Sequence, residues 1–161
     1  MDFPQRVYSS HWNGKQTLTS QTLLAELQVP VGTYCEILRV WITPDLTVGG
    51  PQFFDARIQV SIATLPATGG AAMTINDWSG EGASTCTTLR QANPKGVQNA
   101  IMQNAFSLRN GFEWIPHPDE RPMIVGGTAD RDNFGVTILN TAGDAWTSIQ
   151  LNCGFIWREL S

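Results

Sequence analysis

Alternation of apolar and polar residues is clearest near the C-terminal end of the chain, over residues 147–160. Five apolar residues share one face of this segment: Ile149, Leu151, Cys153, Phe155 and Trp157. A helix would spread these residues around its axis, whereas a β-strand places them on one side. The segment therefore predicts a long, half-buried strand. Residues 134–138 alternate in the same way, and the turn formers between the two segments predict an antiparallel hairpin.

Further strand patterns precede this hairpin. Residues 16–29 and 53–64 alternate, and residues 34–43 are apolar on both faces, which requires cover on both faces. The 53–64 strand is predicted to lie beside the 34–43 strand. Residues 97–108 fit a helix face as well as a strand face, and their strand neighbours favour a strand.

The remaining segments are rich in glycine and proline. Residues 65–96 predict a long excursion with a short strand at residues 84–89, and the prolines of residues 116–122 separate a short edge strand from a strand at residues 123–126. No segment predicts a convincing helix. The pattern predicts an all-β fold, an antiparallel jelly-roll-like β-sandwich of seven or eight strands. Eight residues are predicted to share its core: Leu38, Val40, Phe54, Ile58, Val60, Ile149, Leu151 and Phe155.

A length of 161 residues fits one domain with a substantial core. Residues 1–15 alternate poorly and end at an Asn-Gly turn signal, so they predict an N-terminal arm ahead of a single β-sandwich domain at residues 16–161. The arm carries three aromatic residues, Phe3, Tyr8 and Trp12. These side chains either pack on their own domain or reach onto a neighbouring subunit, and the sequence leaves both open.

Charged residues make up 15% of the chain, well below the usual share of about a quarter. Two explanations are open: a surface that packs against other protein, or a strand-rich composition in which Thr replaces Lys and Glu. The net charge is −4 and no Lys/Arg cluster is present, so the sequence predicts no direct contact with nucleic acid. No run reaches the length of a membrane span, and the first residues lack the pattern of a signal peptide.

The three cysteines, Cys35, Cys86 and Cys153, lie far apart in the sequence. Cys35 and Cys153 fall inside apolar strand patterns, and a disulfide between them is compatible with the sequence. Buried free thiols are the favoured prediction, because free cysteine packs well in an apolar core. Three free thiols fit synthesis and assembly in a reducing cytoplasm.

Residues suited to catalysis or metal binding are few and scattered. The only histidines, His11 and His117, are too few for the histidine-rich metal site of cupin-like sandwiches. No Gly-x-Ser-x-Gly elbow occurs, and the adjacent Asp119 and Glu120 fall on opposite sides of an extended segment. The acidic loop at residues 130–133 lacks the ligand spacing of a calcium loop. The sequence therefore predicts no enzyme activity, no metal and no cofactor.

Six aromatic residues are candidates for a protein interface: Phe3, Tyr8, Trp12, Trp41, Trp78 and Trp146. Trp78 in the long excursion and Trp146 at a turn are the better candidates for exposure. An exposed tryptophan anchors a protein interface or stacks on a sugar ring. The competing interpretation is that these side chains fold back onto their own domain, which is the commoner arrangement.

Four motifs between residues 34 and 160 together resemble those of small phage-associated β-sandwich virion proteins. They are Glu36–Trp41, the loop Leu65–Gly70, the segment Gly111–Pro116 with Pro118–Pro122, and the C-terminal Gly154–Glu159. The resemblance implies a structural virion protein, such as a capsid decoration (cement) or minor capsid subunit. It implies no catalytic residue.

The expected function is therefore binding of capsid or other virion proteins by a homo-oligomer, with a trimer as the specific expectation. The expected location is the virion, after assembly in the host cytoplasm. The alternative is a glycan-binding β-sandwich module on a tail or surface appendage, which would use exposed tryptophans.

Overall fold

The computed structural model describes residues 6–18, 21–44, 55–107, 110–128, 132–139 and 146–160. These ranges contain twelve β-strands and one short 3-10 turn, η1 (Pro118–Glu120). The strands are β1 (Arg6–Leu18), β2 (Gln21–Gln28), β3 (Tyr34–Pro44), β4 (Asp55–Thr68), β5 (Ala71–Ala72), β6 (Thr74–Asp77), β7 (Thr87–Arg90), β8 (Asn93–Ser107), β9 (Phe112–Trp114), β10 (Met123–Val125), β11 (Asn133–Leu139) and β12 (Trp146–Leu160). No membrane-spanning helix is found in these ranges.

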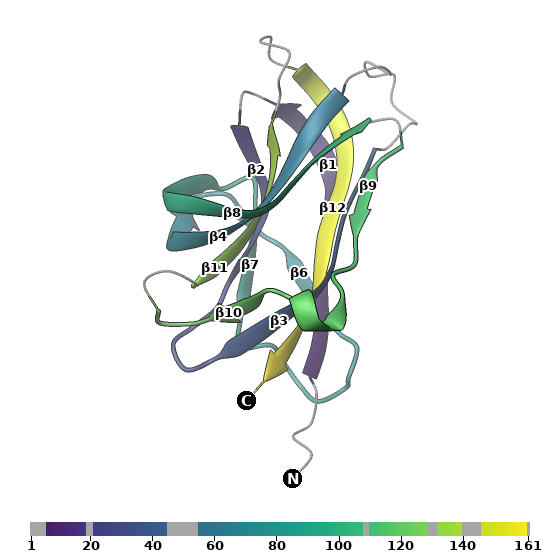
Figure 1. The fold of residues 1–161 in the computed structure, drawn as a ribbon. Helices are drawn as coiled ribbons and strands as arrows, with labels where there is room; N and C mark the ends of the chain where they lie inside the picture. Colours follow the sequence, from purple (N-terminus) through teal and green to yellow (C-terminus); the bar gives the residue numbers. More distant parts are fainter. Residues whose placement is uncertain are drawn as a thin grey trace.

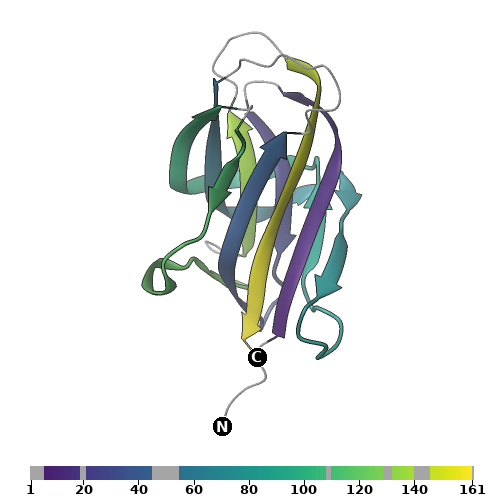
Figure 2. The ribbon, with the colours of Figure 1, turned by 90° about the vertical axis from the view of Figure 1, so that its right-hand side faces the viewer.

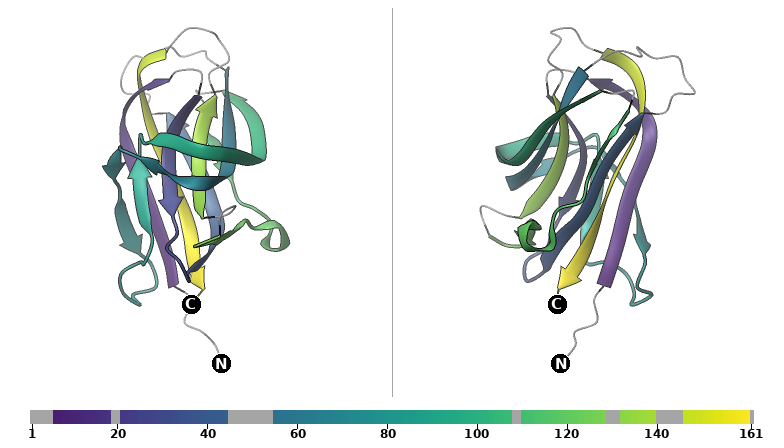
Figure 3. Two further views of the ribbon diagram at one scale, coloured as in Figure 1. Left: turned by 90° about the vertical axis from the view of Figure 1, so that its left-hand side faces the viewer. Right: turned by 45° about the vertical axis from the view of Figure 1, so that its right-hand side comes forward.

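The strands form two antiparallel sheets that pack face to face around one main core (Figure 1). The first sheet has the order β10-β3-β12-β1-β6, and β9 also pairs with β3. Figure 2 shows β3, β12 and β1 of this sheet side by side. The second sheet has the order β5-β7-β2-β11-β4-β8, and β4 and β8 curl together at one end of it (Figure 3, left). The predicted all-β sandwich is confirmed.

The path of the chain between the sheets is that of a jelly roll. The long strands β1, β2, β3 and β4 alternate between the first and second sheet, and β11 and β12 return to the second and the first. Each sheet thus receives strands from both ends of the chain, as in a double-sheet jelly roll. The strand number exceeds the expected seven or eight. Residues 65–96 add β5, β6 and β7 at the sheet edges, and the proline-rich segment separates β9 from β10.

The N-terminal segment belongs to the sandwich. β1 pairs with β12 along its length and with β6 over four residues on its other side. Tyr8 and Trp12 lie in the core, with 0% and 4% of their surface exposed. The predicted division into an arm at residues 1–15 and a domain from residue 16 is therefore wrong for residues 6–15. A strand between two partners satisfies its backbone groups inside the sheet and cannot act as a detached arm.

The predicted alternation is confirmed in β12. All five apolar residues of its predicted core face are buried: Ile149, Leu151, Cys153, Phe155 and Trp157. They pack against buried residues of the opposite sheet, and Phe155 meets Phe134 of β11 edge-to-face with 6.1 Å between ring centroids. β12 therefore contributes the five apolar side chains to the core, as its sequence predicts.

Alternation is broken in β3. Ile37 and Val40 are both fully buried, whereas Leu38 is only partly buried. The pairing with β12 skips Leu38, and such a bulge shifts the alternation by one residue. The prediction of Leu38 as a core residue is therefore wrong. The other predicted core residues are buried, except Phe54, which lies outside the described residues.

Two predicted strand pairings are wrong. β11 pairs with β2 and β4, whereas β12 pairs with β1 and β3 in the other sheet, so they form no hairpin. β4, predicted beside β3, lies in the opposite sheet between β11 and β8. Alternation indicates which residues face the core, but it does not identify the neighbouring strand. The ambiguous segment at residues 97–108 is confirmed as a strand as far as Ser107, within β8.

Candidate functional site

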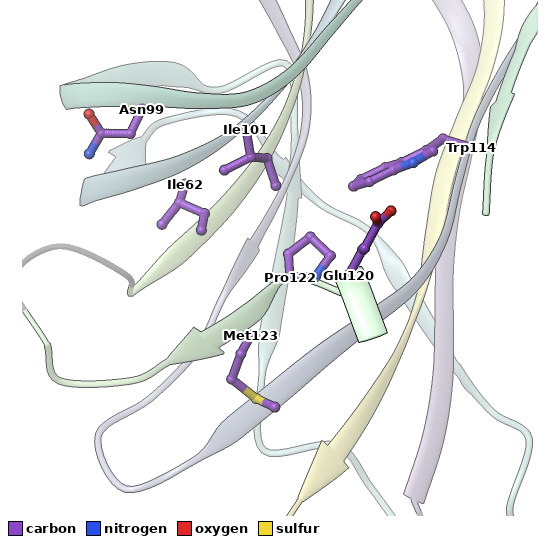
Figure 4. Close-up of a pocket in the computed structure, with 7 residues that line it drawn as sticks. All are labelled: Ile62, Asn99, Ile101, Trp114, Glu120, Pro122 and Met123. Atoms are coloured by element: carbon purple, nitrogen blue, oxygen red, sulfur yellow. The ribbon is translucent and has the colours of Figure 1, made fainter. Parts of the chain in front are cut away.

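A pocket of about 580 Å³ opens between the two sheets, on the side formed by β8 and by the connection from β9 to β10 (Figure 4). Its lining residues are Ile62, Asn99, Ile101, Trp114, Glu120, Pro122 and Met123. The volume lies within the range of about 300–1,000 Å³ that is typical of ligand sites. This pocket is the main candidate functional site in the described part of the chain.

The elements around the pocket are held by aromatic contacts and by prolines. Phe106 of β8 and Phe112 of β9 bring the two sheets together, with ring centroids 5.8 Å apart. After β9, buried Pro116 leads the chain away from the sheet, and η1 turns it back toward β10. The Nδ1 atom of His117 accepts a hydrogen bond from the Asp119 amide at 3.4 Å and caps this turn. The connection therefore faces β8 across the pocket (Figure 3, right).

The pocket combines an apolar surface with two polar groups. The Trp114 ring enters from one side and Ile62 and Ile101 from the other, and the carboxylate of Glu120 lies below the ring (Figure 4). Asn99 provides an amide at the rim. An aromatic face with a carboxylate beside it suits a sugar ring, and the apolar surface suits a side chain of another protein. One carboxylate among the lining residues is insufficient for the acid and base pair of a glycosidase.

The aromatic residues predicted for an interface do not form one surface. Tyr8 packs on Trp157 with ring centroids 5.7 Å apart, and the Nε1 atom of Trp12 donates to the Leu24 carbonyl at 2.9 Å. Both are core residues, so their assignment to an interface is wrong. Their burial follows from their place on the face of β1 that packs into the core between the sheets.

Trp78 is 67% exposed, which confirms its predicted exposure. Its Nε1 atom donates to the Ser9 Oγ at 2.7 Å, so one edge of the indole is fixed to β1. Trp146 begins β12, but its side chain lies outside what the structure describes, as does all of Phe3. The predicted interface roles of Phe3 and Trp146 stay predictions.

Trp41 lies in a smaller hollow of about 250 Å³ that Arg39, Phe112 and Glu113 also line. Its Nε1 atom donates to the Asn152 Oδ1 at 3.2 Å, and the guanidinium of Arg39 lies 5.5 Å from its ring centroid. Arg39 also pairs with Glu113 at 2.5 Å. Two contacts therefore hold this indole against its own domain, and Glu113 fixes the arginine that makes one of them, which favours the fold-back interpretation for Trp41.

Sequence reasoning missed the residues of the pocket. Trp114 was one of six tryptophans, and no pattern distinguished it from the others. Ile101 is the one lining residue that the pattern indicates as an apolar side chain outside the core. Strand alternation in residues 97–108 places Met102 on the core face and Ile101 on the other face. The structure leaves Ile101 41% exposed, so it is an apolar residue on the open side of its strand.

The two histidines are not brought together as metal ligands. His11 is an exposed residue of β1, and His117 is an exposed residue before η1. Among the described residues, the one group of three potential ligands is Cys35, Cys86 and Glu159, whose ligand atoms lie within 4.8 Å of one another. All three residues are buried.

The cysteines are free, and the pairing left open by the sequence does not occur. Cys153 lies opposite Ile42 in the β3–β12 register, whereas Cys35 lies seven positions earlier in β3. The sulfur nearest to Cys35 belongs to Cys86, with 3.3 Å between the Sγ atoms. Cys86 directly precedes β7 in the opposite sheet, so the two thiols meet across the sandwich.

Glu159 anchors the segment that carries Cys86. Its carboxylate accepts hydrogen bonds from the hydroxyl of Ser84, from the hydroxyl and amide of Thr85 at 3.2 and 3.4 Å, and from the Trp157 Nε1 at 3.4 Å. Burial by itself would raise the pKa of Glu159, but these donors outweigh it and hold the pKa below its usual value. Glu159 is therefore a structural anion that binds residues 84 and 85 to β12.

No protein-family model matches the chain, and neither does any curated protein or any solved structure.

Proposed function

We propose that this protein is a structural component of a virus particle, a capsid decoration or minor capsid subunit that binds further copies of itself and other virion proteins. The observation that carries the self-assembly part of the proposal is β8, a strand of 15 residues at the end of the second sheet. The virion part rests on the resemblance of the four sequence motifs. No strand of the described chain lies beyond it. Lys95 is the only charged residue in its sequence.

A long edge strand with so few charges is unusual for a monomeric protein. Edge strands present backbone donors and acceptors, and they are normally kept short or carry charges. The other edge strands follow this rule, because β5, β6, β9 and β10 have only two to four residues each. β8 instead runs without a bulge from Met102 to Ser107 opposite β4. Its exposed residues there, Gln103, Asn104 and Ala105, are neutral. The edge therefore suits addition of a strand from another chain.

The occupant that fits this edge best is another copy of the same chain. Two β8 strands can meet without electrostatic repulsion, because neither has a charge between Met102 and Ser107. Pairing of β8 with β8 about a two-fold axis gives a dimer. The trimer expected from the sequence requires β8 to meet a different edge of its neighbour. Ile101 and Trp114 lie beside this edge, so a neighbour's side chain in the pocket would gain apolar contact.

The test is the molar mass of the purified protein at micromolar concentration, measured by light scattering. We expect two or three times the chain mass of 17.7 kDa. The variant Asn104→Lys places a charge on the exposed edge strand. It should be a monomer in light scattering, with an unchanged melting temperature. The matched control Asn76→Lys, on the short edge strand β6, should remain assembled.

The link to the virion is tested by sedimentation with shells that lack the protein. We expect the wild-type protein to sediment with such shells. A monomeric wild-type protein that also fails to sediment with them would refute the proposal.

Glycan binding is the second candidate function, favoured by the arrangement of Trp114, Asn99 and Glu120 in the pocket. A sugar ring stacked on the Trp114 indole would place its hydroxyls near the Glu120 carboxylate, and the Asn99 amide lies across the pocket for a second sugar unit. Titration calorimetry with soluble glycans tests it. Trp114→Ala should weaken binding about tenfold, the equivalent of one aromatic contact. Trp78→Ala, which changes an exposed tryptophan outside the pocket, should leave the affinity unchanged.

A further inference from the structure

Cys35 and Cys86 lie close enough to form a disulfide bond, although both are free thiols in this structure. Their Sγ atoms lie 3.3 Å apart, inside the usual contact distance of two sulfurs and about 1.3 Å longer than a disulfide bond. Cys35 is in β3 of the first sheet, and Cys86 precedes β7 of the second sheet. A bond between them would join the two sheets across the core and close a loop between positions 51 residues apart.

A metal ion is the other ligand that such a cluster suggests, and the carboxylate argues against it. Glu159 already accepts hydrogen bonds from Ser84, Thr85 and Trp157 on its two oxygens. A metal would have to displace these donors. Structural zinc also requires four ligands, whereas this group offers three.

We propose that Cys35 and Cys86 are a disulfide-forming pair that closes when the protein meets a low-molecular-weight disulfide such as oxidised glutathione. One cysteine thiolate attacks a sulfur of the oxidant, which forms a mixed disulfide and releases one glutathione thiolate. The second cysteine then displaces the second glutathione and completes the Cys35–Cys86 bond. The two protons lost by the cysteines go to the two glutathione thiolates, and the two electrons reduce the bond of the oxidant.

The reaction proceeds through local opening of the segment before β7. Cys35 and Cys86 are 0% and 3% exposed, so the oxidant cannot reach them in the closed structure. The hydrogen bond with the adjacent Cys86 thiol, together with burial, raises the pKa of Cys35 and keeps it protonated there. Residues 80–83 are exposed, and release of Ser84 and Thr85 from Glu159 would uncover Cys86. The pair is therefore stable as thiols in a reducing cytoplasm and closes slowly after transfer to an oxidising medium.

The test uses the full-length protein, first reduced and then incubated with excess oxidised glutathione. Thiols are counted after denaturation in an alkylating reagent. We expect three thiols before incubation and one afterwards, the remaining one being Cys153. Peptide mapping should show the peptide of Cys35 linked to the peptide of Cys86, with no glutathione attached. The oxidised protein should melt about 5–15 °C higher than the reduced protein, because the bond restricts a long loop in the unfolded chain.

Two variants separate this bond from other effects of oxidation. Cys86→Ser should lose the rise in melting temperature between the reduced and oxidised forms, whereas Cys153→Ala should keep it even if its core is less stable. Three thiols after oxidation, or a link to Cys153, would overturn the proposal. So would one zinc ion per chain that protects Cys35 and Cys86 from the alkylating reagent in the native protein, since the pair would then be a metal site.

Discussion

Trp12 provides the sharpest test of whether the N-terminal segment is part of the sandwich. The side chain is 4% exposed, and its Nε1 atom donates to the Leu24 carbonyl at 2.9 Å. Replacement of a buried tryptophan by alanine costs about 3–5 kcal/mol through lost contacts and the cavity left behind. The Leu24 carbonyl also accepts from the Gln91 amide at 3.2 Å, so it is not left without a donor. The packing loss therefore dominates.

A loss of this size is easily measured in a chain of 161 residues. The free energy of unfolding of a typical domain is about 5–15 kcal/mol, so Trp12→Ala should remove a large part of it. The expected fall in melting temperature is about 6–20 °C. Trp12→Phe keeps a ring in the core but loses the N–H donor, and it should cost much less. His11→Ala changes the exposed neighbour on the same strand and should alter the stability by no more than about 0.5 kcal/mol.

The assay is urea unfolding followed by circular dichroism, together with light scattering of each variant. An arm that only contacts a neighbouring subunit would give the opposite pattern: Trp12→Ala would keep its stability and lose assembly. If Trp12→Ala unfolds at the same urea concentration as His11→Ala, the placement of β1 in the core is refuted.

Three further predictions concern the core and two buried carboxylates. Leu151→Ala should cost about 2–5 kcal/mol in urea unfolding, because Leu151 is fully buried in β12. The pKa of Glu159 is lowered on folding, so its stabilisation is present above the usual pKa of about 4.3 and is lost as the pH falls through the folded pKa. Glu159→Gln should therefore flatten the acid side of the stability profile. Burial raises the pKa of Glu26, so this residue affects the pH dependence of stability with the opposite sign. Stability is lost as the pH rises through the folded pKa of Glu26, and Glu26→Gln should reduce that loss.

The sequence by itself determined the class of the fold and the core face of its clearest strand. Side chains of a strand point alternately to its two faces, so a period of two in residues 149–157 was enough to identify the buried side of β12. The polar, glycine-rich setting of Trp78 likewise indicated its exposure. These features depend on local backbone geometry, which the residues themselves specify.

Only the tertiary structure decided which strands are neighbours and which side chains meet. β11 and β12 follow each other in the chain but lie in different sheets. β1 belongs to the first sheet because it pairs with β12 on one side and with β6 on the other. The bulge at Leu38 is set by the pairing with β12, and the pocket exists only where β8 faces η1. Cys35 meets Cys86, which is 51 residues away, and no local pattern encodes that contact. Pairing between distant segments depends on the packing of the whole domain, so a one-dimensional pattern leaves it open.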